Sequence, residues 1–295
     1  MALKIAFGMI VFEGDYVLHE ALESVYPYAE QILIAEGPVQ FWQDRGKVTS
    51  TDKTNQIIDN FPDPEGKISI VHGQFAEKDE QCRAYMPFLN DDIDYIWNLD
   101  SDEVFKGEDI EKIIEILEKE KYTSVGVRSC SFYGGFNHYI SGFEQMKDNF
   151  LRIFKVYPGA NWLTHRPPTI VAPEGVETLP EKHLDSETLW RDHGVQMYHY
   201  SYVFPTQVKN KLEYYKAKVS KQYCHPNYFD DIYLPWVTGN REVEKAWKGV
   251  HEFNPNIRMH SFTEEFSGSH PVAILKSMDK LTTRLHDELQ RFLEE

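Results

Sequence analysis

Several carboxylates stand together at the end of one short apolar run. Residues 95–99 read Tyr-Ile-Trp-Asn-Leu, and Asp100, Ser101, Asp102 and Glu103 follow them directly. Asp and Ser also end strands and cap helices, so the composition of the cluster alone decides little. Carboxylate oxygens are hard ligands that suit Mg²⁺ or Mn²⁺, and open α/β sheets bind ligands beyond the carboxyl ends of their strands. The stretch therefore predicts a divalent metal site at a strand end.

The elements around this stretch alternate between strand and helix. Apolar runs and alternating patterns predict strands at 4–12, 31–35, 67–71, 95–99, 122–127, 150–156 and 195–200. Helical spacing of apolar residues predicts helices at 16–26, 52–60, 78–89, from 107 onward, and at 206–222, 242–250 and 271–293. Glycines and prolines predict irregular chain over 132–142 and 162–184. This order predicts an α/β fold with a mostly parallel sheet flanked by helices, a domain over 1–204 and a helical C-terminal extension over 205–295.

Composition narrows the classes of partner. The 295 residues contain 31 Lys and Arg against 47 Asp and Glu, and a net charge of -16 disfavours nucleic acid and anionic lipid as partners. The longest apolar run, residues 5–12, is too short to span a bilayer, and residues 1–4 do not resemble a secretory signal. We therefore expect a cytoplasmic protein. Cys82, Cys130 and Cys224 form neither a disulfide framework nor a metal knuckle.

Several segments, in order, resemble the family 2 glycosyltransferases with the GT-A fold. Residues 9–15 and 22–25 resemble the first strand of that family, its turn and the helix after it. Residues 32–37 resemble the second strand, and 81–83 resemble the helix that precedes the metal motif. Residues 94–103 resemble the metal-binding segment itself, which contains the DXD motif. The resemblance covers roughly the first 130 residues, and it implies a GT-A fold with a nucleotide-sugar site.

The resemblance assigns roles within the metal motif. It implies that Asp100 faces the ribose or a metal-bound water, that Ser101 contributes to donor binding, and that Asp102 is the direct metal ligand and a catalytic residue. Glu103 would orient them. Residues 198–202 resemble a strand that brings a histidine to the metal in many GT-A enzymes, so His199 is the predicted third ligand.

Outside the motif, the chain departs from the family at several positions. The second strand ends on Glu36 rather than on the Asp expected near the nucleobase, and Arg83 is the predicted partner of the diphosphate or the base. Where related enzymes have a His-Glu pair, this chain has His165 and Arg166. Arg166 is predicted to bind the donor. An inverting transferase needs another carboxylate for the proton of the acceptor hydroxyl, for which Glu144, Asp148 and Asp192 are the candidates, whereas a retaining transferase can lack a dedicated base.

These observations predict a metal-dependent glycosyltransferase that uses Mn²⁺ or Mg²⁺. Its expected partners are a nucleoside-diphosphate sugar, by default a UDP-sugar, a hydroxyl acceptor on a glycan or similar molecule, and a second copy bound through the last helix. One alternative is a sugar-phosphate nucleotidyltransferase, although that class needs a basic Gly-rich loop after the first strand and residues 12–15 are acidic instead. A second alternative is a non-catalytic protein of the same fold that binds nucleotide sugars.

Overall fold

The computed structural model describes residues 3–142, 149–218, 224–253 and 261–294. It contains two compact units, of which one comprises Met1–Val127 with Asn149–Val195 and the other Arg128–Asp148 with Gln196–Glu295. The boundary predicted at 204/205 differs from this division, because the strand at Met197–Tyr202 pairs with the strand at Ser129–Tyr133 within the second unit. Among the described residues, no helix is both long and apolar enough to cross a membrane.

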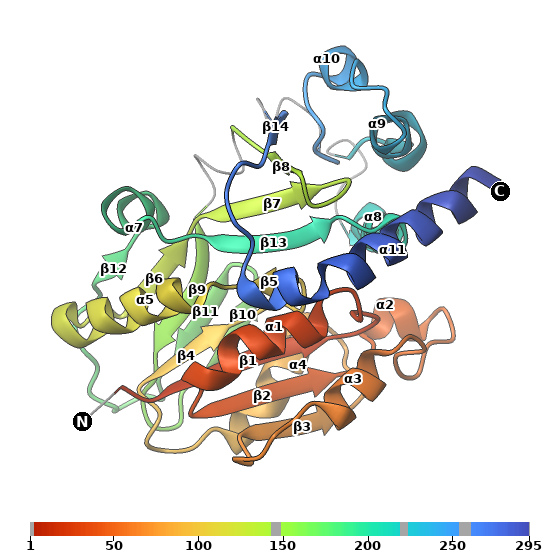
Figure 1. Ribbon diagram of the computed structural model, residues 1–295. Coiled ribbons are helices and arrows are strands. Elements are labelled where there is room, and N and C mark those ends of the chain that lie inside the picture. The colour runs from red at the N-terminus through yellow and green to blue at the C-terminus, as the bar shows by residue number, and fades with distance from the viewer. Residues whose placement is uncertain (1–2, 143–148, 219–223, 254–260, 295) are drawn as a thin grey trace. The chain divides into compact units, whose positions relative to one another are not determined.

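A seven-stranded sheet forms the centre of the first unit, in the order β12-β6-β9-β4-β1-β2-β3 (Figure 1). Its strands are β1 (Ile5–Val11), β2 (Gln31–Glu36), β3 (Ile68–His72), β4 (Tyr95–Asn98), β6 (Ser124–Val127), β9 (Phe150–Lys155) and β12 (His183–Leu184). Neighbouring strands are parallel except at β9, which runs antiparallel to both β4 and β6. The predicted α/β class with a mostly parallel sheet is thus confirmed.

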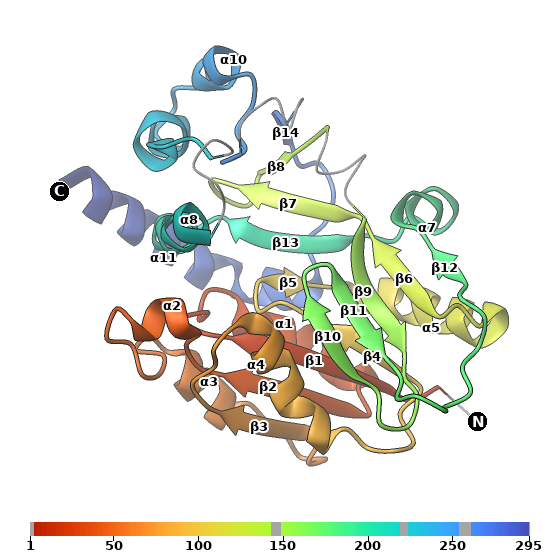
Figure 2. The same ribbon diagram turned by 180° about the vertical axis from the view of Figure 1, so that it is seen from behind.

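Helices and a hairpin cover the two faces of this sheet. Helices α1 (Leu18–Val25) and α5 (Gly107–Glu120) lie on one face (Figure 1), and α4 (Lys78–Tyr85) lies on the other with the hairpin of β10 (Asn161–His165) and β11 (Pro168–Val171) (Figure 2). The remaining elements of this unit are β5 (Glu103–Val104), α2 (Gln40–Gln43), α3 (Thr54–Asn60), α7 (Ser186–His193) and the 3-10 turns η1 (Tyr26–Tyr28) and η2 (Met86–Phe88).

The hairpin and α7 lie where the sequence predicts irregular chain or no element. The β10–β11 hairpin places Pro168 at the first residue of its strand, where a missing N–H is tolerated. Helix α7 begins where the Asp185 side chain accepts a hydrogen bond from Thr188 N at 2.9 Å, an N-cap that lies within a proline-rich context.

The core of the first unit follows from its strand sequences. Every residue of β1 and β2 is buried, as expected for parallel strands that are covered on both faces. On the α1 and α5 face, Trp97 stacks on Phe7 with 5.2 Å between ring centroids and meets Phe105 edge-on at 4.8 Å. Strand β4 is therefore held firmly up to the residues that begin the acidic motif.

The second unit combines a small sheet with helices. Its strands are β7 (Ser129–Tyr133), β8 (His138–Ile140), β13 (Met197–Tyr202) and β14 (Thr263–Glu265), and β13 is parallel to β7 while β8 is antiparallel to both β7 and β14. Its helical segments are α8 (Pro205–Lys218), η3 (Phe229–Tyr233), α9 (Leu234–Val237), α10 (Val243–Trp247) and α11 (Val272–Glu294). The predicted loop over 132–142 is therefore largely the β7–β8 hairpin, whose turn contains Gly134 and Gly135 at φ of 62° and 148°.

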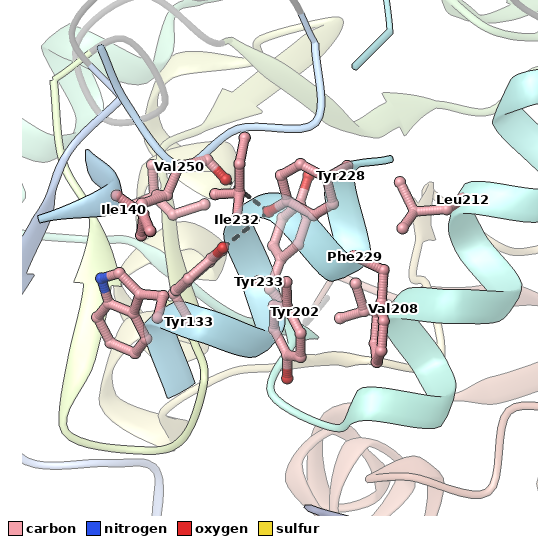
Figure 3. Close-up of a cluster of buried hydrophobic side chains, with 12 residues drawn as sticks. Tyr133, Ile140, Tyr202, Val208, Leu212, Tyr228, Phe229, Ile232, Tyr233 and Val250 are labelled. Carbon is pink, nitrogen blue, oxygen red and sulfur yellow. Dashed lines mark hydrogen bonds between the residues drawn. The ribbon is translucent and has the colours of Figure 1, made fainter. Parts of the chain in front are cut away.

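Aromatic side chains dominate the core of this second unit (Figure 3). The hydroxyl groups of Tyr133 and Tyr228 lie 2.9 Å apart, and Tyr228 also donates to the carbonyl oxygen of Val250. Tyr233 donates to the carbonyl oxygen of Val203 at 2.8 Å. The polar ends of these buried rings thus have hydrogen-bond partners, which lets them fill the core at low cost.

Candidate functional site

The acidic motif forms a closed turn directly after β4. The backbone N–H of Glu103 donates to the carbonyl oxygen of Asp100 at 3.0 Å, and the N–H of Asp100 donates to Glu103 Oε2 at 3.2 Å. Ser101 and Asp102 lie in the middle of this turn and are half-buried. The first unit therefore presents the motif at the carboxyl end of a buried parallel strand, as the sequence predicts.

A single arginine from the antiparallel strand β9 joins both ends of this turn. Arg152 Nε donates to the two carboxylate oxygens of Glu103 at 3.1 and 2.9 Å, and Nη2 also contacts Glu103 Oε1. The same Nη2 lies 3.2 Å from Asp100 Oδ2. The side chains of Arg152 and Glu103 are 7% and 0% exposed, so this ion pair is buried.

Positive charges gather around Asp100. Burial alone would raise the pKa of this carboxyl, but the charges of Arg152, Arg166 and Lys78 hold the pKa well below its usual range. Asp100 is therefore ionised at any physiological pH. Of the predicted donor-binding residues, Arg166 thus acts on the motif electrostatically, while its side chain is exposed.

The chemistry of the donor atoms suits a hard divalent cation. Asp100, Ser101 and Asp102 offer carboxylate and hydroxyl oxygens, which are the ligands that Mg²⁺ and Mn²⁺ prefer. Within the part of the chain that the structure describes, no three His, Cys, Asp or Glu side chains form a group that could hold a metal ion. Such ions are commonly bound by one or two carboxylates together with substrate phosphates, and the residues of this turn fit that mode.

The loop after β1 packs closely against the turn. A Cβ atom on Gly14 would lie 2.8 Å from Ser101 Oγ, so a larger residue at position 14 would require the Ser101 hydroxyl to shift. The N–H of Gly14 donates to Thr54 Oγ1 at 2.9 Å, and the N–H of Glu13 donates to Ser50 Oγ at 2.9 Å. The strand-end loops of the first unit thus support one another around Ser101.

Glu36, the predicted nucleobase contact, is buried and engaged by its neighbours. Its Oε1 accepts from the N–H of Ser50 at 3.0 Å, and its Oε2 lies 3.1 Å from His72 Nδ1 and 3.5 Å from Thr49 Oγ1. The side chain is 1% exposed. Its visible role is to fix the loop around Ser50 to the ends of β2 and β3.

A buried glutamine fixes the ends of the first two strands. Gln81 Nε2 lies within hydrogen-bond distance of the carbonyl oxygens of Val11, Ala35 and Gly37, at 3.3, 2.9 and 3.2 Å. Gly37 has φ of 143°, and a Cβ on it would lie 1.8 Å from the carbonyl oxygen of Gly73. Position 37 therefore needs glycine, and the strand ends that carry the loops are held rigidly.

Two other predicted site residues, Arg83 and Asp192, make contacts within the first unit. Arg83 Nη1 donates to the carbonyl oxygens of Trp162 and Leu163 at 3.4 and 3.2 Å, which ties α4 to β10. Asp192 is exposed on α7 and pairs with the neighbouring Arg191, Nε to Oδ1, at 2.8 Å.

Two further predicted site residues stay untested. His199 belongs to the second unit, on β13, where its Nδ1 lies 3.4 Å from Ser131 Oγ. The metal set of Asp100, Asp102 and His199 therefore spans the two units and remains a prediction. Glu144 lies outside the described residues, and so does the alternative candidate Asp148.

A buried cysteine and histidine lie near Asp100. Cys82 Sγ is 3.6 Å from His165 Nδ1, and the N–H of His165 donates to Asp79 Oδ1 at 2.6 Å. Burial raises the pKa of the Cys82 thiol to about 12 and lowers the pKa of the His165 imidazole to about 3, although the Asp100 carboxylate opposes the second shift. Both side chains are thus neutral at pH 7, and Cys82 is not an activated nucleophile.

Sequence reasoning missed Arg152 and the structural use of Gln81. Arg152 had one signal, because it is the only charged residue between apolar neighbours in 150–154, where strand alternation places it on a buried strand. Gln81 had no sequence signal of this kind, although it belongs to residues 81–83, which resemble a helix of the family.

Comparison with known proteins bears on the same stretch of chain. Residues 49–167 match the model of the family described as glycosyl transferase family 2. No curated protein gives a significant match to the chain.

Solved structures show only weak similarity. Residues 1–349 of S. aureus TarS are 12% identical over 45% of this chain and 38% of that one, with a TM-score of 0.34, and a UDP-GlcNAc complex of TarS matches with the same TM-score. A 4-diphosphocytidyl-2C-methyl-D-erythritol synthase from Anaerococcus prevotii is 13% identical over 52% of this chain and 72% of that one, with a TM-score of 0.33. These TM-scores are too low to carry an inference, and the chain aligns with well under half of the TarS fragment. The family match contains α4, the acidic turn and Arg152, and it confirms the resemblance of residues 49–167 to glycosyl transferase family 2.

Proposed function

We propose that this protein transfers a sugar from a nucleoside-diphosphate sugar to a hydroxyl group of a glycan or similar acceptor, with Mn²⁺ or Mg²⁺ bound at the acidic turn. The observation that carries the proposal is the Asp100-Ser101-Asp102 turn at the carboxyl end of β4, inside the segment that matches the family model. UDP-sugar is the default donor.

The residues of the turn have distinct roles in this proposal. Asp102 holds the divalent ion directly, Asp100 supports it as an ionised carboxylate, and Ser101 contacts the donor. The chemistry that bound Mn²⁺ or Mg²⁺ would supply is neutralisation of charge on the departing nucleoside diphosphate. His199 is the proposed third ligand.

Cationic side chains near the turn suit the diphosphate of the donor. Arg166 and Lys78 both act electrostatically on Asp100, so each carries positive charge close to the carboxylates. Guanidinium and ammonium groups bind phosphate oxygens through charge-assisted hydrogen bonds. We propose that these two side chains hold the phosphates.

The acceptor side of the site requires a proton acceptor if the transfer inverts the anomeric centre. Asp192 and Glu144 are the proposed candidates. An Asn variant at each position tests this role, since loss of sugar transfer with donor hydrolysis retained would identify the base.

The last helix is the proposed surface for self-association. Helix α11 carries Val272, Leu275 and Leu293 at 65%, 48% and 61% exposure. Light scattering after size-exclusion chromatography would show whether Leu275→Glu converts a dimer to a monomer.

The test of the main proposal is nucleotide release from a panel of UDP, GDP, ADP and CMP sugars with Mn²⁺. Asp102→Asn should lower the release rate by about 100-fold or more, because the variant loses the charge that holds the ion. Asp94→Asn is the matched control, since Asp94 lies at the other end of β4 and pairs with Lys155 Nζ at 3.0 Å. We expect Asp94→Asn to keep the wild-type rate.

The outcomes separate the candidate functions. Release from one donor that Asp102→Asn removes and Asp94→Asn preserves supports the transferase. Metal-dependent binding of a nucleotide sugar without release from any donor would point to the non-catalytic protein. If Mn²⁺ has no effect on nucleotide binding in a thermal shift assay, the metal site is wrong.

A further inference from the structure

We propose that Arg152 is a positioning residue that fixes both ends of the acidic turn and thereby orients Asp102 toward the divalent ion. The inference rests on the proposed function and deepens it, because it assigns a task at the same site to a residue outside the metal motif. In this proposal Arg152 itself contacts neither the ion nor the donor.

Strand pairing explains why an arginine at this position reaches the turn. Strand β9 runs antiparallel to β4, with Trp97 opposite Ile153, so Arg152 lies across from the last residue of β4. The next residues along the chain beyond β4 are those of the turn. A side chain of arginine length at position 152 therefore points its guanidinium to where the carboxylates begin.

The contacts of the guanidinium constrain the turn at two places. Nε and Nη2 together grip Glu103, and Nη2 also reaches Asp100 Oδ2 at 3.2 Å. The backbone of the turn closes the same pair of residues against each other through the N–H groups of Asp100 and Glu103. With positions 100 and 103 fixed, the direction of Asp102 is set by the residues on either side of it.

Burial makes this constraint specific to arginine. The guanidinium is planar and presents its N–H groups in a fixed fork, whereas a lysine ammonium is a point charge on a flexible stem. Because Arg152 and Glu103 are 7% and 0% exposed, water cannot substitute for a lost N–H donor. A lysine at position 152 would keep the charge but could not hold Glu103 and Asp100 in the present arrangement.

The ion pair also gives the three acids of the turn, Asp100, Asp102 and Glu103, different roles. Arg152 occupies Glu103 and one oxygen of Asp100, namely Oδ2, so the contact leaves Asp100 Oδ1 outside this ion pair. Residues that orient metal ligands from behind commonly change metal affinity by about 10- to 100-fold when they are replaced. This magnitude sets the expected effect at position 152.

The experiment measures Mn²⁺ binding by the electron paramagnetic resonance signal of free Mn²⁺, with UDP present, in wild type and Arg152→Lys. A thermal unfolding scan checks that each variant is folded. Lys155→Arg is the matched control, because it exchanges one cation for the other on the same strand, where Lys155 pairs with Asp94 at 3.0 Å. Steady-state nucleotide release over a range of Mn²⁺ concentrations gives the second readout.

We expect folded Arg152→Lys to bind Mn²⁺ at least about 10-fold more weakly than wild type, while Lys155→Arg stays within about twofold. The KM for Mn²⁺ should rise by a similar factor, and kcat at saturating Mn²⁺ should fall less. Folded Arg152→Lys with wild-type Mn²⁺ affinity would overturn the proposal and leave Arg152 a purely structural ion pair.

Glu103→Gln keeps the test decisive if Arg152→Lys does not fold. This variant retains the shape of the side chain and the contact of Arg152 with Asp100, but it weakens one of the two anchors. It should also weaken Mn²⁺ binding, and unchanged affinity would overturn the proposal. Failure of the proposed function looks different, since wild type itself would then bind no Mn²⁺ with UDP, and the positioning role would be rejected with it.

Discussion

Two buried glutamates lie at or beyond the carboxyl ends of the two strands that flank β1, and their partners differ. Glu36 ends β2 and is matched by the N–H of Ser50 and the imidazole of His72. Glu103 follows β4 and is matched by the guanidinium of Arg152. The first carboxylate fastens a loop, whereas the second shapes the acidic turn. The partner of an acid at a strand end, more than the acid itself, therefore decides what that strand end does.

The largest loss of stability should come from removing the partner of Glu103. Arg152→Met leaves Glu103 buried without its cation, and we expect it to lower the free energy of unfolding by about 3–5 kcal/mol. Urea unfolding followed by circular dichroism measures this loss. The double variant with Glu103→Leu should recover most of the stability, because it removes the unpaired charge. A loss below about 1 kcal/mol for Arg152→Met would mean that the pair is not buried in solution.

Low pH should lower the unfolding free energy through His165. Its pKa in the folded protein is about 3, well below the ordinary value of 6.5, because the ring is buried. Between these two values the unfolded chain binds the proton and the folded chain does not, so stability falls as pH decreases. We expect a loss of about 2 kcal/mol between pH 7 and pH 5. In His165→Gln, urea unfolding at these two pH values should show that this part of the pH dependence has disappeared; an unchanged dependence would assign it elsewhere.

A substitution at Glu36 should lower the unfolding free energy by less. Glu36→Gln keeps an acceptor for the Ser50 N–H and changes the contacts of Oε2 with His72 and Thr49, so we expect a loss of about 1 kcal/mol in unfolding free energy. The same variant tests the predicted contact with the nucleobase. If the KM ratio between UDP and GDP sugars shifts more than about tenfold while stability changes little, Glu36 reads the base as well as holding the loop.

The smallest effect on stability is expected for an acid that is exposed. Asp192→Asn should change the unfolding free energy by no more than about 0.5 kcal/mol, because Asp192 lies on the surface and pairs only with the adjacent Arg191 among the contacts described. Sugar transfer by this variant would then report chemistry alone. Wild-type transfer rates would remove Asp192 from the candidates for the acceptor base.

The sequence predicted the parts of the fold that depend on local pattern. The apolar runs of β1 to β4 and the periodic helix α5 lie close to their expected ranges, because burial on one or both faces is written into consecutive residues. The β7–β8 and β10–β11 hairpins were missed, since glycine and proline at their turns resemble those of loops. The place of β9 between β4 and β6 was beyond local pattern, because strand pairing depends on distant segments.

The candidate site shows the same limit. Asp100, Ser101 and Asp102 were predicted as site residues because their types and their place after a strand suggest one chemistry. Arg152 was not, because its contact with the turn follows from the antiparallel course of β9 rather than from any motif. Glu36 was predicted to lie near the nucleobase, and its contacts with the Ser50 loop were not visible in the sequence.

The distance along the chain between the turn and its arginine has a consequence for how the protein forms. Arg152 lies 49 residues after Glu103 and 52 after Asp100. During synthesis, the acidic turn leaves the ribosome well before its cation, and contacts of this separation must wait for loop closure. Strands β1, β2 and β4 can associate earlier, but the acidic turn reaches its final shape only once β9 has entered the sheet. The acids of the turn therefore acquire their final arrangement only after the chain has been made through residue 152, well after the turn itself.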